Sequence, residues 1–152
     1  MTNEYIKPPV EIRYKNELDA LKSVDIGKKP ENWMLSPKAV RTFILGGIIK
    51  TADGKMQIKR KFYGNDALVE RCIITLAGNR GLMLVGEPGT AKTMLSELLS
   101  AACCGISTNT VQGTAGTTED MIKYSWNYAM LLSKGPVSYT HLRAHETSLH
   151  LV

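Results

Sequence analysis

The stretch GEPGTAKT, residues 86–93, constrains the fold of this chain more than any other. It follows the phosphate-binding pattern G-x-x-x-x-G-K-[ST], except that Ala91 stands at the second glycine. An apolar run, LMLV at 82–85, leads into it, and a helical pattern, KTMLSELLSAAC at 92–103, leads out. This order surrounds a bound phosphate with unpaired backbone N–H groups and the positive end of a helix. We therefore expect an α/β fold in which 82–85 is a buried strand of a parallel sheet.

Each position of the loop suits a role in holding phosphate groups. Gly86 and Gly89 lack a Cβ atom that would block a phosphate or bar an unusual backbone conformation. Pro88 limits the conformational freedom of the loop. Lys92 supplies a positive charge toward the outer phosphates of a nucleotide, and the Thr93 hydroxyl is placed to coordinate Mg²⁺.

Ala91 is the departure from the pattern. Because the position before the lysine lies where the helix begins, we expect the alanine's right-handed backbone preference to be no obstacle. A glycine-proline turn followed by an unrelated lysine is the alternative interpretation. The order of strand, loop and helix favours the phosphate-binding interpretation.

Residues 1–35 look like a peripheral N-terminal segment. Pro8-Pro9 near its start and Lys28-Lys29-Pro30 near its end are expected to break regular structure. Within it, 16–24 predicts a short helix with three apolar residues on one side: Leu18, Leu21 and Val24. Ser36-Pro37 is a good N-cap followed by a good first helical residue. Gly46-Gly47 is expected to end that helix.

Further elements are predicted on both sides of the loop. A hairpin is expected to turn at Asp53-Gly54. The stretch DALVERCIITLAGNR at 66–80 predicts a helix that ends at Gly78-Asn79. Its apolar residues at helical spacing are Leu68, Cys72, Ile73 and Leu76. After the loop, NTVQ at 109–112 is a candidate second strand, and a further helix is expected to begin near 118–120.

Three stretches carry a family resemblance, and the first two overlap. GLMLVGEPGTAKTMLSELLSAA, KFYGNDALVERCIITLAGNRGLMLVGEPGTAKT and VQGTAGTTEDMIKYSWNYAMLLSKGP resemble MoxR-type AAA+ ATPases, in which alanine before the loop lysine is common. The resemblance covers about 36–137 and is most specific over 62–136. It implies a P-loop NTPase fold, a three-layer α/β sandwich with a parallel sheet, here incomplete. Residues 36–137 would then be the N-terminal part of an AAA+ nucleotide-binding domain.

The resemblance also implies a ligand, a site and partners. Relatives bind ATP or ADP with Mg²⁺, usually as hexameric rings that remodel or activate a protein substrate, and a von Willebrand factor type A domain protein is one candidate substrate. Thr93 would coordinate Mg²⁺, and Tyr63 and Gly64 match the segment near the adenine. The residues carried over as holding the phosphates are Gly86, Glu87, Pro88, Gly89, Thr90, Ala91, Lys92, Thr93 and Met94.

Hydrolysis in this family needs an apolar strand ending in Asp-Glu, whose Asp helps hold Mg²⁺ and whose Glu orients water. The adjacent acidic pair after Thr93 is Glu119-Asp120, which follows GTAGTT and fits a helix start instead. We therefore identify no catalytic residue, and expect an ATPase as the full-length protein but no hydrolysis by these 152 residues. One alternative is a nucleotide-binding adaptor that never hydrolyses ATP. Another is a small-molecule kinase, but the acceptor-binding and lid residues that a kinase should show soon after the loop are not found in the sequence.

Residues 138–152 do not resemble the rest of the family and look like an unrelated or disordered tail, of the kind an adapter-derived artefact leaves. All three histidines lie there, at His141, His145 and His150. A metal site is the alternative, but H-E-x-x-x-H is one residue longer than the zinc signature. Arg143 is not expected to act as an arginine finger.

Charge and cysteine content argue against nucleic-acid-binding, disulfide-stabilised and membrane proteins. The net charge of +5 comes from scattered groups such as Lys59-Arg60-Lys61, read as solvated surface, and no nucleic-acid partner is expected. Cys72, Cys103 and Cys104 are too few and too poorly spaced for a disulfide framework, so buried thiols are expected. With no signal peptide and no apolar run of membrane-span length, a cytoplasmic protein without membrane contact is the simplest expectation.

Overall fold

The structure, a computed structural model, describes residues 7–52 and 54–110. Residues 7–52 and 54–109 belong to one compact unit. The predictions for 111–137, which include the second half of the strand at 109–112, Glu119-Asp120 and the helix after it, lie outside the described residues. The same holds for the tail at 138–152.

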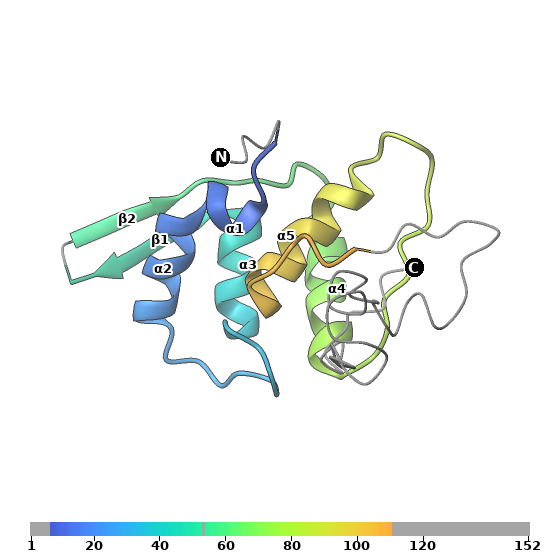
Figure 1. Cartoon of the computed structure of the whole chain (residues 1–152). Coiled ribbons are helices and arrows are strands. Elements are labelled where there is room, and N and C mark those ends of the chain that lie inside the picture. The colour runs from blue at the N-terminus through green and yellow to red at the C-terminus, as the bar shows by residue number, and fades with distance from the viewer. Residues whose placement is uncertain (1–6, 53, 111–152) are drawn as a thin grey trace, which may run out of the picture. The chain divides into compact units, whose positions relative to one another are not determined.

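Five helices and one hairpin make up the described part of the chain (Figure 1). The chain runs through α1 (Val10–Arg13), α2 (Lys15–Val24), α3 (Pro37–Leu45), β1 (Gly47–Thr51), β2 (Gly54–Ile58), α4 (Asp66–Ala77) and α5 (Lys92–Cys104). The two strands pair antiparallel, with Gly47 opposite Ile58 and Thr51 opposite Gly54. The predicted hairpin is therefore confirmed, although Asp53 at its turn lies outside the described residues.

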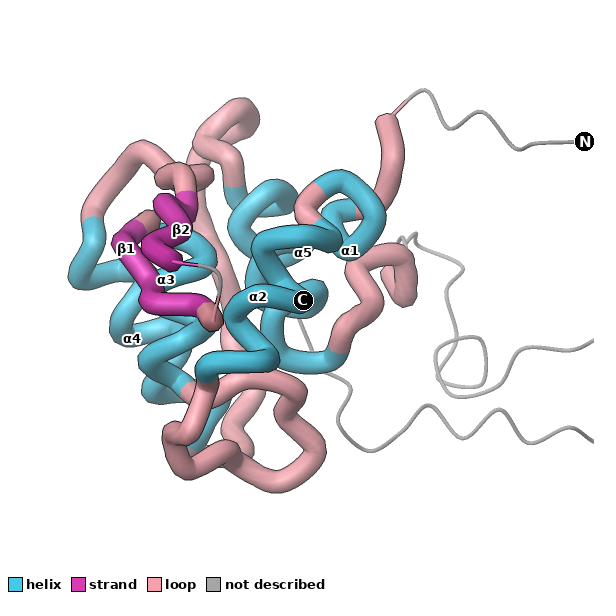
Figure 2. Tube along the Cα trace, turned by 90° about the vertical axis from the view of Figure 1, so that its left-hand side faces the viewer, coloured by secondary structure: helices cyan, strands magenta, loops and turns pink. Residues whose placement is uncertain are grey.

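The five helices form one connected set. Helix α1 contacts α2 and α5, α2 also contacts α3, and α3 contacts α4 and α5 (Figure 2). Each of the four longer helices contributes fully or nearly fully buried apolar side chains, among them Leu21 of α2, Phe43 of α3, Val69 of α4 and Leu99 of α5. Burial of such side chains is the main favourable term in folding.

The N-terminal segment contributes to this core. Val10 of α1 and Leu18 and Leu21 of α2 are buried in the same apolar cluster as the residues of α3, α4 and α5. Residues 10–24 therefore pack as part of the core although 1–35 look peripheral in sequence. The predicted boundaries at residues 35 and 137 stay predictions.

Helix α3 begins and ends as the sequence predicts. The Ser36 hydroxyl accepts a hydrogen bond from the backbone N–H of Ala39 at 3.3 Å, and Pro37 takes the first helical position. Gly46 ends the helix with a φ of 83°. A Cβ atom at Gly46 would lie 2.9 Å from the backbone nitrogen of Arg60, so this position requires glycine.

Helix α4 has the predicted extent but a different buried face. Asn65 caps it by accepting from the N–H of Ala67 at 2.9 Å, and it ends at Gly78. Leu68 is 41% exposed and is not part of the buried face, which is a correction to the prediction. The buried set is Val69, Cys72, Ile73 and Leu76. These positions follow the i, i+3, i+4, i+7 spacing of one helix face, which the set beginning at position 68 does not.

The run at 82–85 does not form the expected strand. Leu82 takes part in an isolated bridge, and the residues after it are in no ladder. Leu82 and Leu84 are half-buried, whereas Met83 and Val85 are 68% and 83% exposed. Met83 and Val85 thus lack the cover that a strand buried on both faces has, and within the described residues the sheet is the antiparallel β1–β2 pair. The parallel sheet stays a prediction.

The three cysteines all lie in the described part of the chain, and none forms a disulfide. Cys72 and Cys103 are buried and Cys104 is half-buried. Burial raises the pKa of all three thiols, most strongly that of Cys103, where the neighbouring Cys104 adds to the effect. The expectation of buried thiols is confirmed for Cys72 and Cys103. Among the described helices, none is long and apolar enough to span a membrane.

Candidate phosphate-binding site

The chain between α4 and α5 is a long loop that stands away from the helices (Figure 1), and residues 86–90 near its end are exposed. Gly89 has a φ of 81°, and a Cβ atom there would meet no other atom within 4 Å. Glycine is thus favoured at position 89 by its backbone conformation and not by crowding. The Thr90 hydroxyl donates to the carbonyl oxygen of Glu87 at 2.8 Å, which closes the turn.

The Lys92 side chain folds back over this loop. Its ammonium donates to the carbonyl oxygens of Gly86 at 2.8 Å and Glu87 at 2.5 Å, and to the Thr90 hydroxyl at 2.9 Å. An ammonium has three N–H donors, so the loop receives all of them. The structure therefore brings together the lysine and the loop that the sequence pattern pairs.

Ala91 precedes α5 in a left-handed conformation, with φ 58° and ψ 23°. The expectation that alanine keeps a right-handed backbone here is wrong. The turn from the loop into the helix imposes the left-handed geometry, which costs a residue with a Cβ about 1–2 kcal/mol. This cost explains why the pattern asks for glycine at position 91.

The start of α5 suits an anion. Ala91 has no side-chain acceptor, so it makes no capping hydrogen bond to the first N–H groups of this 13-residue helix. Thr93 and Met94, in the first turn of the helix, are exposed to solvent. The residues present fit a phosphate group, which would accept from these N–H groups and from Lys92.

A divalent cation fits this site only together with phosphate oxygens. Within the described residues no three His, Cys, Asp or Glu side chains gather as a metal-binding group. Mg²⁺ is commonly held by one or two protein oxygens, water and substrate phosphates. Thr93 supplies one such oxygen, and its role as a Mg²⁺ ligand stays a prediction.

Tyr63 and Gly64 lie on the turn before α4. The Tyr63 side chain is 81% exposed. A Cβ atom at Gly64 would lie 2.8 Å from Cε1 of Phe62, so glycine makes room for the buried Phe62 ring. Their place near an adenine stays a prediction.

Lys61 is the residue that sequence reasoning misplaced. Its side chain is 3% exposed, so Lys59-Arg60-Lys61 is not simply solvated surface. The ammonium donates to Oε2 of Glu17 at 2.5 Å and to the Phe43 carbonyl at 2.8 Å. Burial lowers the pKa of Lys61, and the hydrogen bond and charge of Glu17 oppose that shift. The basic run itself carries no signal of this burial.

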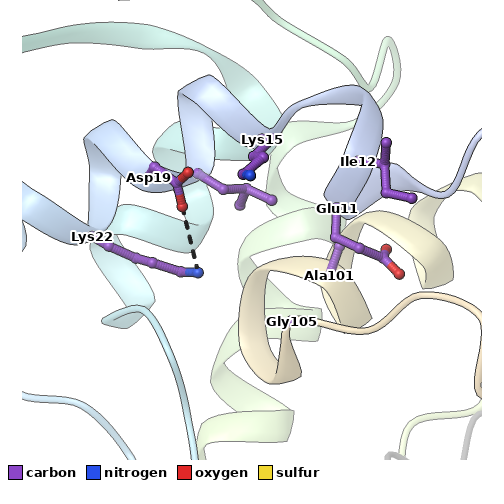
Figure 3. Close-up of a pocket in the computed structure, with 8 residues that line it drawn as sticks. Glu11, Ile12, Lys15, Asp19, Lys22, Ala101 and Gly105 are labelled. Atoms are coloured by element: carbon purple, nitrogen blue, oxygen red, sulfur yellow. Dashed lines mark ion pairs between the residues drawn. The ribbon is translucent and has the colours of Figure 1, made fainter.

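A cavity of about 390 Å³ lies between α1, α2 and α5 (Figure 3). Two acidic side chains, Glu11 and Asp19, face it together with two basic ones, Lys15 and Lys22, and Asp19 pairs with Lys22 at 3.8 Å. None of the loop residues 86–91 lines this cavity. With its balanced charges it offers no counterpart to the phosphate-binding loop.

Comparison with known proteins agrees with the geometry of the loop. Residues 81–144 match the family model described as the AAA domain (dynein-related subfamily). The chain is also similar to the Uncharacterized protein YehL of Escherichia coli (strain K12), with 50% identity over 134 residues, or 88% of this chain. The chain spans 35% of the length of that relative. No solved structure matches this chain.

The matched segment contains the whole phosphate-binding loop and helix α5. The match supports an ATP-binding AAA+ ATPase with a P-loop NTPase fold. An AAA domain implies nucleotide binding, typically with Mg²⁺, and often assembles into oligomeric rings.

Proposed function

We propose that residues 86–94 bind ATP or ADP together with Mg²⁺, as part of an AAA+ ATPase of the MoxR type. The observation that carries the proposal is the geometry of Lys92, whose ammonium lies over the loop at the uncapped start of α5. That geometry falls inside the segment similar to the AAA domain.

Each group at the site has a defined part in this binding. The N–H groups at the start of α5 donate to phosphate oxygens, and the ammonium of Lys92 exchanges hydrogen bonds to the loop for hydrogen bonds to the phosphates. The Thr93 hydroxyl is the protein ligand of Mg²⁺, which neutralises charge on the phosphates when bound. Gly89 permits the left-handed backbone of the loop, with its φ of 81°.

The activity of the whole protein is a wider proposal. By its resemblance to the MoxR type, the full-length protein would hydrolyse ATP in a hexameric ring and remodel or activate a partner protein, with a von Willebrand factor type A domain protein as one candidate. The chain spans 35% of the length of the relative YehL. We therefore propose hydrolysis for the full-length protein and not for these 152 residues.

Titration calorimetry with MgATP and MgADP tests the binding proposal. We expect Lys92→Ala to weaken both by at least about tenfold, which is 1.4 kcal/mol. Lys55→Ala is the matched control, because Lys55 is an exposed lysine on β2. Equal affinities for the wild type and Lys92→Ala would overturn the proposal.

A further inference from the structure

The β1–β2 hairpin has one face against the helices and one face in solvent. Helix α2 packs against β1, and Ile49 and Met56 pack against the apolar core, in which Ile58 is buried. Successive side chains of a strand point to opposite faces. The exposed side chains between these three therefore form an outer face, and the end of the hairpin stands clear of the helices (Figure 1).

The outer face carries an apolar side chain between lysines. Lys50 and Lys55 lie directly opposite each other, next to the pair of residues that flanks the turn. Ile48, opposite Gln57, comes next on this face and is 70% exposed. Lys59 comes directly after β2, where the alternation of buried and exposed residues continues. Neighbours on one face of a strand are about 7 Å apart, so lysines flank the isoleucine on both sides.

The facing lysines do not stabilise the hairpin itself, because like charges directly opposite each other on a sheet are destabilising. Among the described residues, no carboxylate forms an ion pair with Lys50, Lys55 or Lys59. Ile48 leaves most of an apolar side chain in water between them. Lysines at a sheet edge can block unwanted strand pairing, but that role does not call for two facing lysines beside an exposed isoleucine.

The order of these side chains indicates what the face is suited to bind. Carboxylates on both sides of an apolar side chain would meet the lysines and cover Ile48 at the same time. Nucleic acid is the other polyanion to consider, but a row of phosphates offers no apolar contact to Ile48. The described outer face consists of lysine, isoleucine and glutamine, without the aromatic side chains on which bases stack.

We propose that the outer face of the β1–β2 hairpin docks an acidic segment of a partner protein, in which carboxylates flank an apolar side chain. Lys50 and Lys55 pair with acidic groups at one end of the segment and Lys59 at the other, while Ile48 contacts the apolar side chain between them. Because exposed ion pairs are individually weak, several hold the segment together, and its binding weakens as the salt concentration rises. This docking is independent of nucleotide binding at residues 86–94.

Fluorescence anisotropy of the whole 152-residue chain with a labelled synthetic peptide tests the proposal. The peptide repeats glutamate, threonine, valine and threonine, which puts glutamate and valine in turn on one side of an extended strand. Lys50→Glu with Lys55→Glu should weaken binding at least about tenfold, because two attractions become repulsions. This variant keeps like charges opposite each other, so the stability of the hairpin should not change. Ile48→Thr should weaken binding about threefold.

Two further variants separate docking from general effects. Lys28→Glu with Lys38→Glu is the matched control, because both lysines are exposed and lie outside the hairpin. It changes the net charge equally and should leave peptide binding within about twofold. Lys50→Glu alone places a carboxylate opposite Lys55, which favours the hairpin. It should raise the midpoint of urea denaturation and still weaken peptide binding, a combination that damage to the fold cannot produce.

Equal peptide binding by the wild type and by Lys50→Glu with Lys55→Glu would overturn the proposal, as would an equal loss in the matched control. The same holds if the wild type binds the peptide no more tightly than a version with glutamine at every glutamate. A DNA duplex with the same number of negative charges is the second probe. If the wild type binds the duplex as tightly as the peptide and Ile48→Thr weakens neither, the face is a general anion surface and the protein partner is wrong.

Discussion

Within the described residues, Lys61 and Lys92 each make three hydrogen bonds, in opposite surroundings. Lys61 donates to Glu17, Phe43 and Lys59, and its ammonium lies 4.2 Å and 4.8 Å from the ring centres of Phe43 and Tyr14. Its charge is neutralised by a carboxylate inside the core.

Among the described residues, Lys92 donates to neutral oxygens, two carbonyls and one hydroxyl, on an exposed loop. Among the described residues no carboxylate forms an ion pair with it. The number of hydrogen bonds that a lysine makes therefore does not indicate whether its charge is neutralised within the protein. The charge of Lys61 is balanced within the fold, while that of Lys92 is balanced by no described carboxylate, as the proposed phosphate site requires.

The largest expected effect follows from removing the buried partner. Lys61→Ala leaves Glu17 without its cation in a mostly buried site, and breaking such a pair costs about 3–5 kcal/mol of unfolding free energy. Lys92→Ala should change the unfolding free energy by less than about 0.5 kcal/mol, because no buried charge is left unpaired. Urea denaturation of the two variants measures both values.

A double variant controls for the buried charge. Lys61→Met together with Glu17→Leu removes both charges and keeps most of the volume, so it should recover most of the stability lost by Lys61→Ala. If Lys92→Ala proves as destabilising as Lys61→Ala, the contrast between the two lysines is wrong.

The next effect concerns the loop itself. Ala91→Gly removes the left-handed strain of about 1–2 kcal/mol. It also gives the unfolded chain more freedom, which opposes the gain by about 0.4–1 kcal/mol. We therefore expect a net stabilisation of about 0.5–1 kcal/mol in urea denaturation.

Gly89→Ala is the opposite change at the same loop. Its φ of 81° disfavours alanine, and since no atom lies within 4 Å of the new Cβ, the cost comes from the backbone alone. We expect a destabilisation of about 1 kcal/mol or more. If both substitutions destabilise the chain, the conformation assigned to Ala91 is incorrect.

Features set by neighbouring residues could be predicted from the sequence. The Ser36 cap and Gly46 stop gave the bounds of α3, and the glycine-rich pattern with its lysine gave the loop and the start of α5. Each of these depends on contacts only a few residues apart. The same local reasoning misplaced the buried face of α4 by one position at Leu68, because several apolar residues lie close together there.

Features set by distant residues could not be predicted. The partners of Lys61, Glu17 and Phe43, lie 44 and 18 positions away in the chain. Burial of 82–85 depends on what packs against its two faces, which its apolar composition does not contain. The backbone of Ala91 is imposed by the loop before it, against the residue's own preference.

The smallest expected effect compares the two helix starts, because α3 is capped by side chains while α5 is not. Burial alone would raise the pKa of Asp25, but the hydroxyl and N–H of Ser36, both at 2.6 Å, the N–H of Gly27 and the charge of Lys29 together lower it below its ordinary value of 3.8. The ionised Asp25 therefore stabilises the fold fully above pH 3.8, and this stability is lost as the pH falls through the lower folded-state value.

Asp25→Asn should remove this acid-dependent part. We expect the variant to be less stable than the wild type at neutral pH, and the difference to shrink as the pH falls below 3.8. Thermal unfolding of both proteins from neutral pH down to acid measures the difference. Thr93→Val, at the uncapped start of α5, is the control, because it changes no ionisable group and its effect on stability should not vary with pH. A difference between the wild type and Asp25→Asn that stays constant, or grows, toward acid pH would show that the ionised carboxylate does not stabilise the start of α3.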